Sequence, residues 1–140
     1  MEDKIIELEK EIMKMLLEGD LSTLRILREQ FRLSNVTSRE FSGVGFFTDF
    51  EVPNDTEKTD VKSFRLGDVI AEIDHLKHGA GFLLFVENGV ISMLEGFCYD
   101  ENWPETIEGF KLSYLNGPER DLADIEKDIN KNKHETSFDD

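Results

Sequence analysis

The sequence has little cysteine, few basic residues and no long apolar run. The single cysteine, Cys98, excludes an intrachain disulfide and fits the reducing cytosol. No apolar stretch approaches the roughly 20 residues that a membrane span requires. Residues 1–14 are charged from the second position and contain no run typical of a signal peptide. We therefore expect a soluble, cytoplasmic protein without a membrane partner.

Lysine and arginine are scarce relative to the acids. The chain has 16 basic and 31 acidic residues, which gives a net charge of −15. The excess is uneven, because residues 1–39 carry eight acids and seven bases whereas residues 87–108 carry six acids and no base. The electric field of so acidic a chain repels nucleic acid and attracts basic surfaces. The sequence predicts a basic protein partner and no nucleic acid; a charge that serves only solubility is the alternative.

The hydrophobic residues suffice for one core. They make up 39% of 140 residues and include eleven Phe, and a chain of this length is typical of a single domain. We expect one α+β domain over residues 1–131 and a flexible tail over residues 132–140.

Two amphipathic helices open the chain. Apolar residues recur at steps of three and four, as on one face of a helix, first at Ile5, Leu8, Ile12 and Met15 and then at Leu21, Leu24, Leu27 and Phe31. Asp20 or Ser22 is the expected N-cap of the second helix. The short junction predicts an αα-hairpin.

Strand signals follow. The apolar, aromatic or β-branched segments are residues 41–52, 69–73, 81–97 and 110–115. Asn88-Gly89 predicts a type I′ hairpin turn. Both arms of this hairpin are apolar at nearly every position, so we expect it to lie centrally and to be covered on both faces. The predicted fold is an αα-hairpin on a mainly antiparallel sheet of about four to six strands, with a short C-terminal helix over residues 119–131.

Catalytic motifs are absent from the sequence. There is no Gly-x-Ser-x-Gly elbow, and the pairs Gly43/Gly45 and Gly79/Gly81 are too short for a phosphate-binding loop. Acidic neighbours of Cys98 raise a thiol pKa and oppose a nucleophilic role. We predict no catalytic residue and no cofactor.

A small enzyme is the alternative from a different class. Glu95 and Asp100 are candidates for a carboxylate pair, and His75 and His78 for a metal pair completed by nearby acids. A connecting loop explains the histidines more simply, so no metal site is predicted.

The segment after the hairpin combines aromatic and acidic residues, which is typical of protein-binding surfaces. The predicted binding residues are Glu95, Tyr99, Asp100, Glu101 and Trp103. The alternative is that Trp103 fills the bottom of the sheet.

Four of the six arginines lie within fifteen residues: Arg25, Arg28, Arg32 and Arg39. We expect them to pair with carboxylates of the sheet or of a sister subunit. A site for an acidic ligand is the alternative.

Several strings of the sequence resemble a group of small uncharacterised bacterial cytosolic proteins. They are REFSGVGFFT (39–48), HGAGFLLFV (78–86), LEGF (94–97), YDE (99–101) and WP (103–104). Size and acidity are similar to those of immunity proteins, which neutralise antibacterial toxins. This analogy implies a non-enzymatic, acidic module that binds a basic toxin; a homodimer of another role is a further alternative.

Overall fold

The computed structural model describes the backbone of residues 2–138 and the side chains of residues 4–131. The helices are α1 (Glu2–Leu16), α2 (Ser22–Leu33) and α3 (Leu122–Phe138). The strands are β1 (Asn35–Phe41), β2 (Gly45–Glu51), β3 (Phe64–Leu66), β4 (Val69–Ile73), β5 (Ala80–Glu87), β6 (Val90–Cys98) and β7 (Phe110–Tyr114).

All strand pairs are antiparallel and form one seven-stranded sheet. Its order is β1-β2-β6-β5-β4-β7. The short β3 pairs with the second half of β5, and β4 pairs with the first half. The N-terminal helix pair, the antiparallel sheet and the C-terminal helix confirm the predicted α+β fold.

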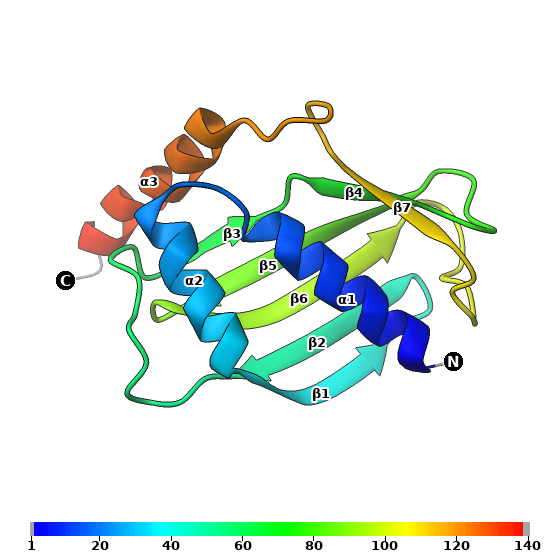
Figure 1. Cartoon of the computed structure of the whole chain (residues 1–140), viewed down its shortest axis with the longest axis horizontal. Helices are drawn as coiled ribbons and strands as arrows, with labels where there is room; N and C mark the ends of the chain where they lie inside the picture. Colours follow the sequence, from blue (N-terminus) through cyan, green and yellow to red (C-terminus); the bar gives the residue numbers. More distant parts are fainter. Residues whose placement is uncertain (1, 139–140) are drawn as a thin grey trace.

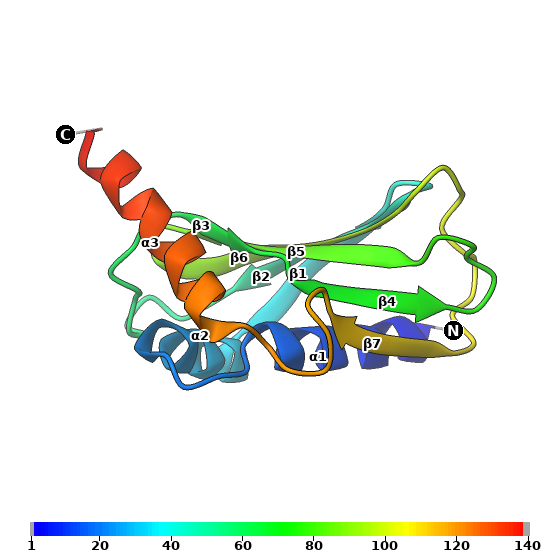
Figure 2. The ribbon, with the colours of Figure 1, turned by 90° about the horizontal axis from the view of Figure 1, so that it is seen from above.

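The two N-terminal helices lie on the same face of the sheet (Figures 1 and 2). Helix α1 packs on β4 and β7, and α2 packs on β6. The core between these layers contains fully buried side chains from both, among them Leu8, Ile12, Leu27, Phe82 and Leu94. Helix α3 packs against β3 at the end of the sheet, so it leaves the second face of the central strands uncovered (Figure 2).

The central hairpin has the predicted turn. Asn88 and Gly89 have φ angles of 54° and 79°, as a type I′ turn requires at both positions. Strands β5 and β6 lie in the middle of the sheet, as expected. The prediction that both faces are covered was wrong. Burial alternates along β5, because only one face of the sheet carries helices.

The boundaries of other elements differ from the predictions. Strand β1 begins at Asn35, ahead of the predicted segment, and the short β3 was missed. The N-cap of α2 is Leu21, whose side chain makes no capping hydrogen bond, so Asp20 and Ser22 were the wrong candidates.

The C-terminal helix also differs from the predicted one. Helix α3 begins at Leu122 and continues to Phe138, past its expected end. The flexible tail over residues 132–140 stays a prediction, and its last two residues lie outside the described residues. Among the described helices, none has the length and apolar character that a membrane crossing needs.

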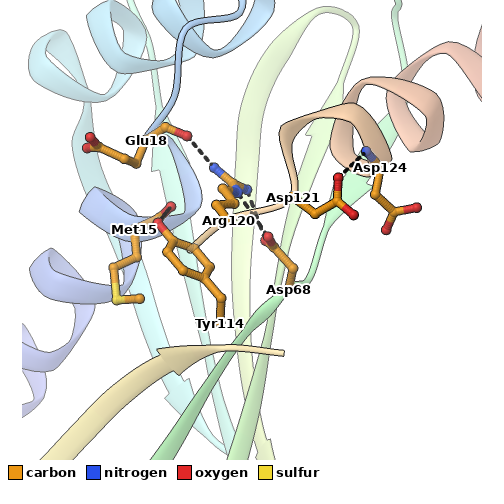
Figure 3. A network of polar contacts seen from close by, with 7 residues as sticks. All are labelled: Met15, Glu18, Asp68, Tyr114, Arg120, Asp121 and Asp124. Atoms are coloured by element: carbon orange, nitrogen blue, oxygen red, sulfur yellow. Dashed lines mark hydrogen bonds and ion pairs between the residues drawn. The ribbon is translucent and has the colours of Figure 1, made fainter. Parts of the chain in front are cut away.

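Arg120 joins the ends of three elements (Figure 3). Its guanidinium donates two 2.9 Å hydrogen bonds to Asp68, which precedes β4, and one of 2.6 Å to the carbonyl of Glu18 after α1. The ring of Tyr114 lies below it, with the guanidinium carbon 5.5 Å from the ring centroid, and the Tyr114 hydroxyl donates to the Met15 carbonyl. Burial raises the pKa of this hydroxyl. The contacts fix the end of α1 to β7 and to the start of β4.

Candidate functional site

The predicted binding residues do not all lie on one surface. Glu95 is in the middle of β6 and points to the uncovered face of the sheet, since its neighbours Leu94 and Gly96 are buried on the helix side. Tyr99 follows β6, is 46% exposed, and stacks edge-on against Phe97 with centroids 5.6 Å apart. Glu95 and Tyr99 therefore flank Phe97.

Two other predicted residues hold the loop in place. Trp103 is only 8% exposed and stacks edge-on against the buried Phe46, with centroids 5.4 Å apart. Trp103 therefore belongs to the core, in line with the alternative interpretation that it fills the bottom of the sheet. The carboxylate of Glu101 accepts hydrogen bonds from the backbone N–H groups of Lys77 and His78, which lower its pKa. Neither side chain is an exposed anchor here.

Asp100 occupies the turn after β6. It is exposed and has a φ of 54°, a left-handed conformation that Asp tolerates. Its place in the turn, unlike the mid-strand position of Glu95, gives no support to a catalytic pair of these two acids.

The uncovered face of strands β2, β5 and β6 is mainly apolar. Its apolar residues alternate with buried ones along each strand and are partly exposed: Phe47, Leu83, Phe85, Met93 and Phe97. We call this set the uncovered apolar face. Its charged neighbours are Asp49, opposite Met93, and Arg65 of β3, whose guanidinium carbon lies 5.8 Å from the Phe85 ring centroid. An antiparallel sheet with helices on one side ordinarily presents polar residues on the other. This surface is therefore unusual for a two-layer fold.

Glu95 lies at the centre of the uncovered apolar face. In the strand register it is opposite Phe47 on one side and Leu83 on the other. Met93 and Phe97 precede and follow it on the same face of β6. Among the side chains that the structure describes, Glu95 takes part in no hydrogen bond or ion pair. A partly buried carboxylate thus lies among apolar groups without a partner.

The histidines and the cysteine do not form a reactive cluster. His75 is exposed and contacts Glu108 at 2.7 Å, and this hydrogen bond raises the histidine pKa. Burial, and secondly the charge of Glu101, raises the pKa of Cys98, whose Sγ donates to the carbonyls of Val44 and Glu101. No group of three or more His, Cys, Asp or Glu residues with metal-site geometry occurs within the described part of the chain.

A second concave site lies on the helix side of the sheet. A cleft of about 760 Å³ opens between α1, the end of α2 and strands β1 and β2. Glu9 lies in its lining and is 5% exposed. The guanidinium of Arg39 donates to both oxygens of this carboxylate, at 2.6 and 2.8 Å, and Thr48 donates a further hydrogen bond. The buried charge is therefore fully paired.

The sequence contains a signal for Glu9 that the prediction missed. Glu9 occupies the i+4 position after Ile5, inside the apolar stripe that Leu8 and Ile12 define. A charged residue at a stripe position must be paired to be buried. The pattern therefore indicates a buried ion pair, although it does not name Arg39.

The arginines pair differently from the expectation. Arg39 is itself on the sheet and pairs with a helix carboxylate, whereas Arg32 pairs with Glu29 on its own helix at 2.5 Å. Arg28 donates to the carbonyls of Leu17 and Gly19, beyond the end of α1. Arg28 and Arg32 thus pair within the helical layer rather than with acids of the sheet, in the part of the chain that the structure describes. Pairing with a sister subunit stays a prediction.

Comparison of the chain with protein-family models, with curated proteins and with solved structures gives no match, so the evidence for function comes from this geometry.

Proposed function

We propose that this protein is a non-enzymatic binding module that docks a basic protein partner on the uncovered apolar face. The observation that carries the proposal is the unpartnered carboxylate of Glu95, surrounded by Phe47, Leu83, Met93 and Phe97. Apolar side chains supply the driving force for docking, and the carboxylate selects a partner that offers a cation at one point.

The apolar character of this face favours a protein partner. Protein-binding surfaces have an apolar centre with aromatic anchors and a polar rim. Phe47, Phe85 and Phe97 supply the aromatic anchors, and Tyr99 extends the face beyond the end of β6. Exposed Asp100 adds a rim charge. This surface retains Glu95, Tyr99 and Asp100 from the predicted set.

The charge favours a basic partner over a second copy of the chain. A two-fold dimer through this face brings the same patch of both copies together. Two Glu95 carboxylates then approach each other across an apolar interface, where like charges repel strongly. An arginine or lysine of a partner has the opposite effect. A toxin with a basic nucleic-acid site is a partner of this kind, in line with the analogy to immunity proteins.

Site-specific photo-cross-linking followed by an affinity measurement tests the proposal. A photoreactive phenylalanine analogue replaces Leu83 on the uncovered apolar face or, as a control, Glu11 on the exposed side of α1. We expect capture of a specific partner from position 83 only. The affinity for that partner is then measured with Glu95→Lys, which we expect to weaken binding at least about tenfold, since it places like charges in a desolvated contact.

Glu11→Lys is the matched control, because it makes the same charge change on an exposed position of the other layer. We expect its affinity to stay within about twofold of the wild type once screening by salt is considered. Equal losses with both variants, or capture from position 11 alone, would show that the uncovered apolar face is not the binding surface. The proposal would also be contradicted if the free protein formed dimers and if these dimers persisted in the Glu95→Lys variant.

A further inference from the structure

The cleft between α1, α2 and the β1–β2 edge differs chemically from the rest of the molecule. Helices α1 and α2 diverge from their short connection toward this edge of the sheet (Figure 1). Four apolar side chains line the cleft: Ile6, Phe31, Val36 and Phe50. Phe31 and Phe50 meet edge-to-face with centroids 5.9 Å apart, and Val36 is 44% exposed. The cleft therefore offers apolar surface that the core does not use.

The charged groups of the cleft are mainly cationic. Among the residues whose side chains the structure describes, Lys10, Arg32 and Arg39 line it together with one acid, Glu9, although the chain carries a net charge of −15. The fork between Arg39 and Glu9 neutralises two of these groups deep in the cleft. The remaining positive charge belongs to the exposed Lys10 and Arg32.

These two cations are accessible to a ligand. Lys10 makes no ion pair with any residue of the described part of the chain. Within the described residues Arg32 forms one ion pair, with Glu29 of its own helix, and the two side chains are 66% and 52% exposed. Exposed pairs of this kind contribute little free energy, so an incoming anion can compete for the guanidinium.

We infer that the cleft binds a small amphipathic carboxylate, which is an apolar chain or ring with one anionic head. Its volume of about 760 Å³ lies within the range of small-molecule sites. The apolar body lies against Phe31, Phe50 and Val36, and the head lies at the mouth between Lys10 and Arg32. A head at the inner end is excluded, because it would meet the buried carboxylate of Glu9.

The ligand carries one negative charge rather than several. Each further charge is repelled by the field of a chain with a net charge of −15. This site lies on the opposite side of the sheet from the uncovered apolar face, so the inference does not depend on the proposed protein partner.

Titration calorimetry with decanoate, below its micelle concentration, tests the inference. We expect saturable one-to-one binding, with amide NMR shifts at Phe31, Val36 and Phe50. Lys10→Gln combined with Arg32→Gln is expected to weaken binding at least about tenfold, and Lys14→Gln, an exposed lysine of α1 outside the lining, to change it less than about twofold.

A second variant tests the place of the apolar body. Val36 lies on the edge strand β1 and is exposed, so Val36→Trp can fill the cleft without disturbing the core. We expect it to abolish decanoate binding while urea unfolding shows an intact fold. Glu95→Lys should bind decanoate like the wild type. Absence of saturable binding, equal affinity for decanol, or binding that survives both cleft variants would overturn the inference.

Discussion

Gln30 and Glu9 are buried polar residues that connect the helices to the sheet. The Gln30 amide donates to the carbonyls of Glu57 and Gly89, at 2.9 and 2.8 Å, and accepts from the backbone N–H of Ile91 at 2.9 Å. Glu9 is held by Arg39 and Thr48. A buried polar group is stabilising only where its partners are present. Each of these residues therefore specifies one docking position of its helix.

Replacing Gln30 by leucine tests this role. The buried N–H of Ile91 and the carbonyl of Glu57 lose their partner, whereas the Gly89 carbonyl keeps the N–H of Thr59. We expect the free energy of unfolding to fall by about 1 to 3 kcal/mol, the cost of stranding the buried N–H of Ile91, because water can reach the carbonyl of the exposed Glu57. Urea unfolding measures it. The control Arg25→Leu, on the exposed side of α2, should change it by less than about 0.5 kcal/mol; similar losses would contradict the role of Gln30.

Single residues of the candidate site were predictable only in part. The mixed aromatic and acidic segment pointed to Glu95 and Tyr99, which flank Phe97 on one surface. Trp103 belongs to the same segment but is buried. Sequence composition cannot separate the two, because the direction of a side chain after a strand depends on the path of the turn. The arginine cluster offered an acidic-ligand site as an alternative, and Arg32 and Arg39 do line the cleft. Its apolar lining was not predictable, since it comes from two helices and two strands.

At the scale of elements, the β5–β6 turn reverses the chain and also holds the loop before β3 and helix α2 by hydrogen bonds. The N–H of Gly89 donates to the Lys62 carbonyl at 2.9 Å, and its own carbonyl accepts from Thr59 and Gln30. A local Asn-Gly signal was sufficient to predict the turn. Its contacts with the loop before β3 are long-range and left no trace in the local sequence.

Gly89→Ala tests two requirements for glycine in this turn, which are the left-handed backbone and the close approach of the loop before β3. Its φ of 79° disfavours an L side chain, and a Cβ there lies 3.0 Å from both the Lys58 Cβ and the Thr59 oxygen. The matched control is Gly43→Ala, where φ is 86° but nothing lies within 4 Å. We expect the control to cost about 1 to 2 kcal/mol for the left-handed backbone alone, and Gly89→Ala to cost more. Thermal or urea unfolding measures both losses of stability. Equal losses would mean that the loop with Lys58 and Thr59 moves aside at no cost in free energy.

The elements that were predicted are those with strong local patterns. The two N-terminal helices have apolar stripes, and the hairpin has its Asn-Gly turn. Strand β1 was only partly recognised, because its sequence NVTSREF is polar and it lies at the edge of the sheet. The hairpin was assigned two covered faces because its arms are apolar on both. Both faces of the hairpin are indeed apolar, but helices cover only one of them. The second, uncovered face is therefore a candidate binding surface.

At the scale of the whole molecule, the sheet separates two surfaces of different chemistry. The uncovered apolar face has Glu95 at its centre, and the cleft on the helix side is lined by Lys10, Arg32 and Arg39. The proposed basic protein and the inferred carboxylate would therefore bind on opposite sides of the sheet without competing. The remaining acids are distributed over the surface, where they steer association and oppose compaction.

The excess of negative charge predicts that salt stabilises the fold. Raising NaCl from about 0.01 to 0.5 M shortens the Debye length from roughly 30 Å to less than 10 Å, which screens repulsion among 31 acids but weakens the few exposed ion pairs far less. We expect a higher urea midpoint at high salt. Glu51→Lys with Glu105→Lys changes two exposed positions by two charges each, from −15 to −11, and should reduce this salt dependence. A midpoint that falls with salt in the wild type would show that paired charges outweigh the repulsion.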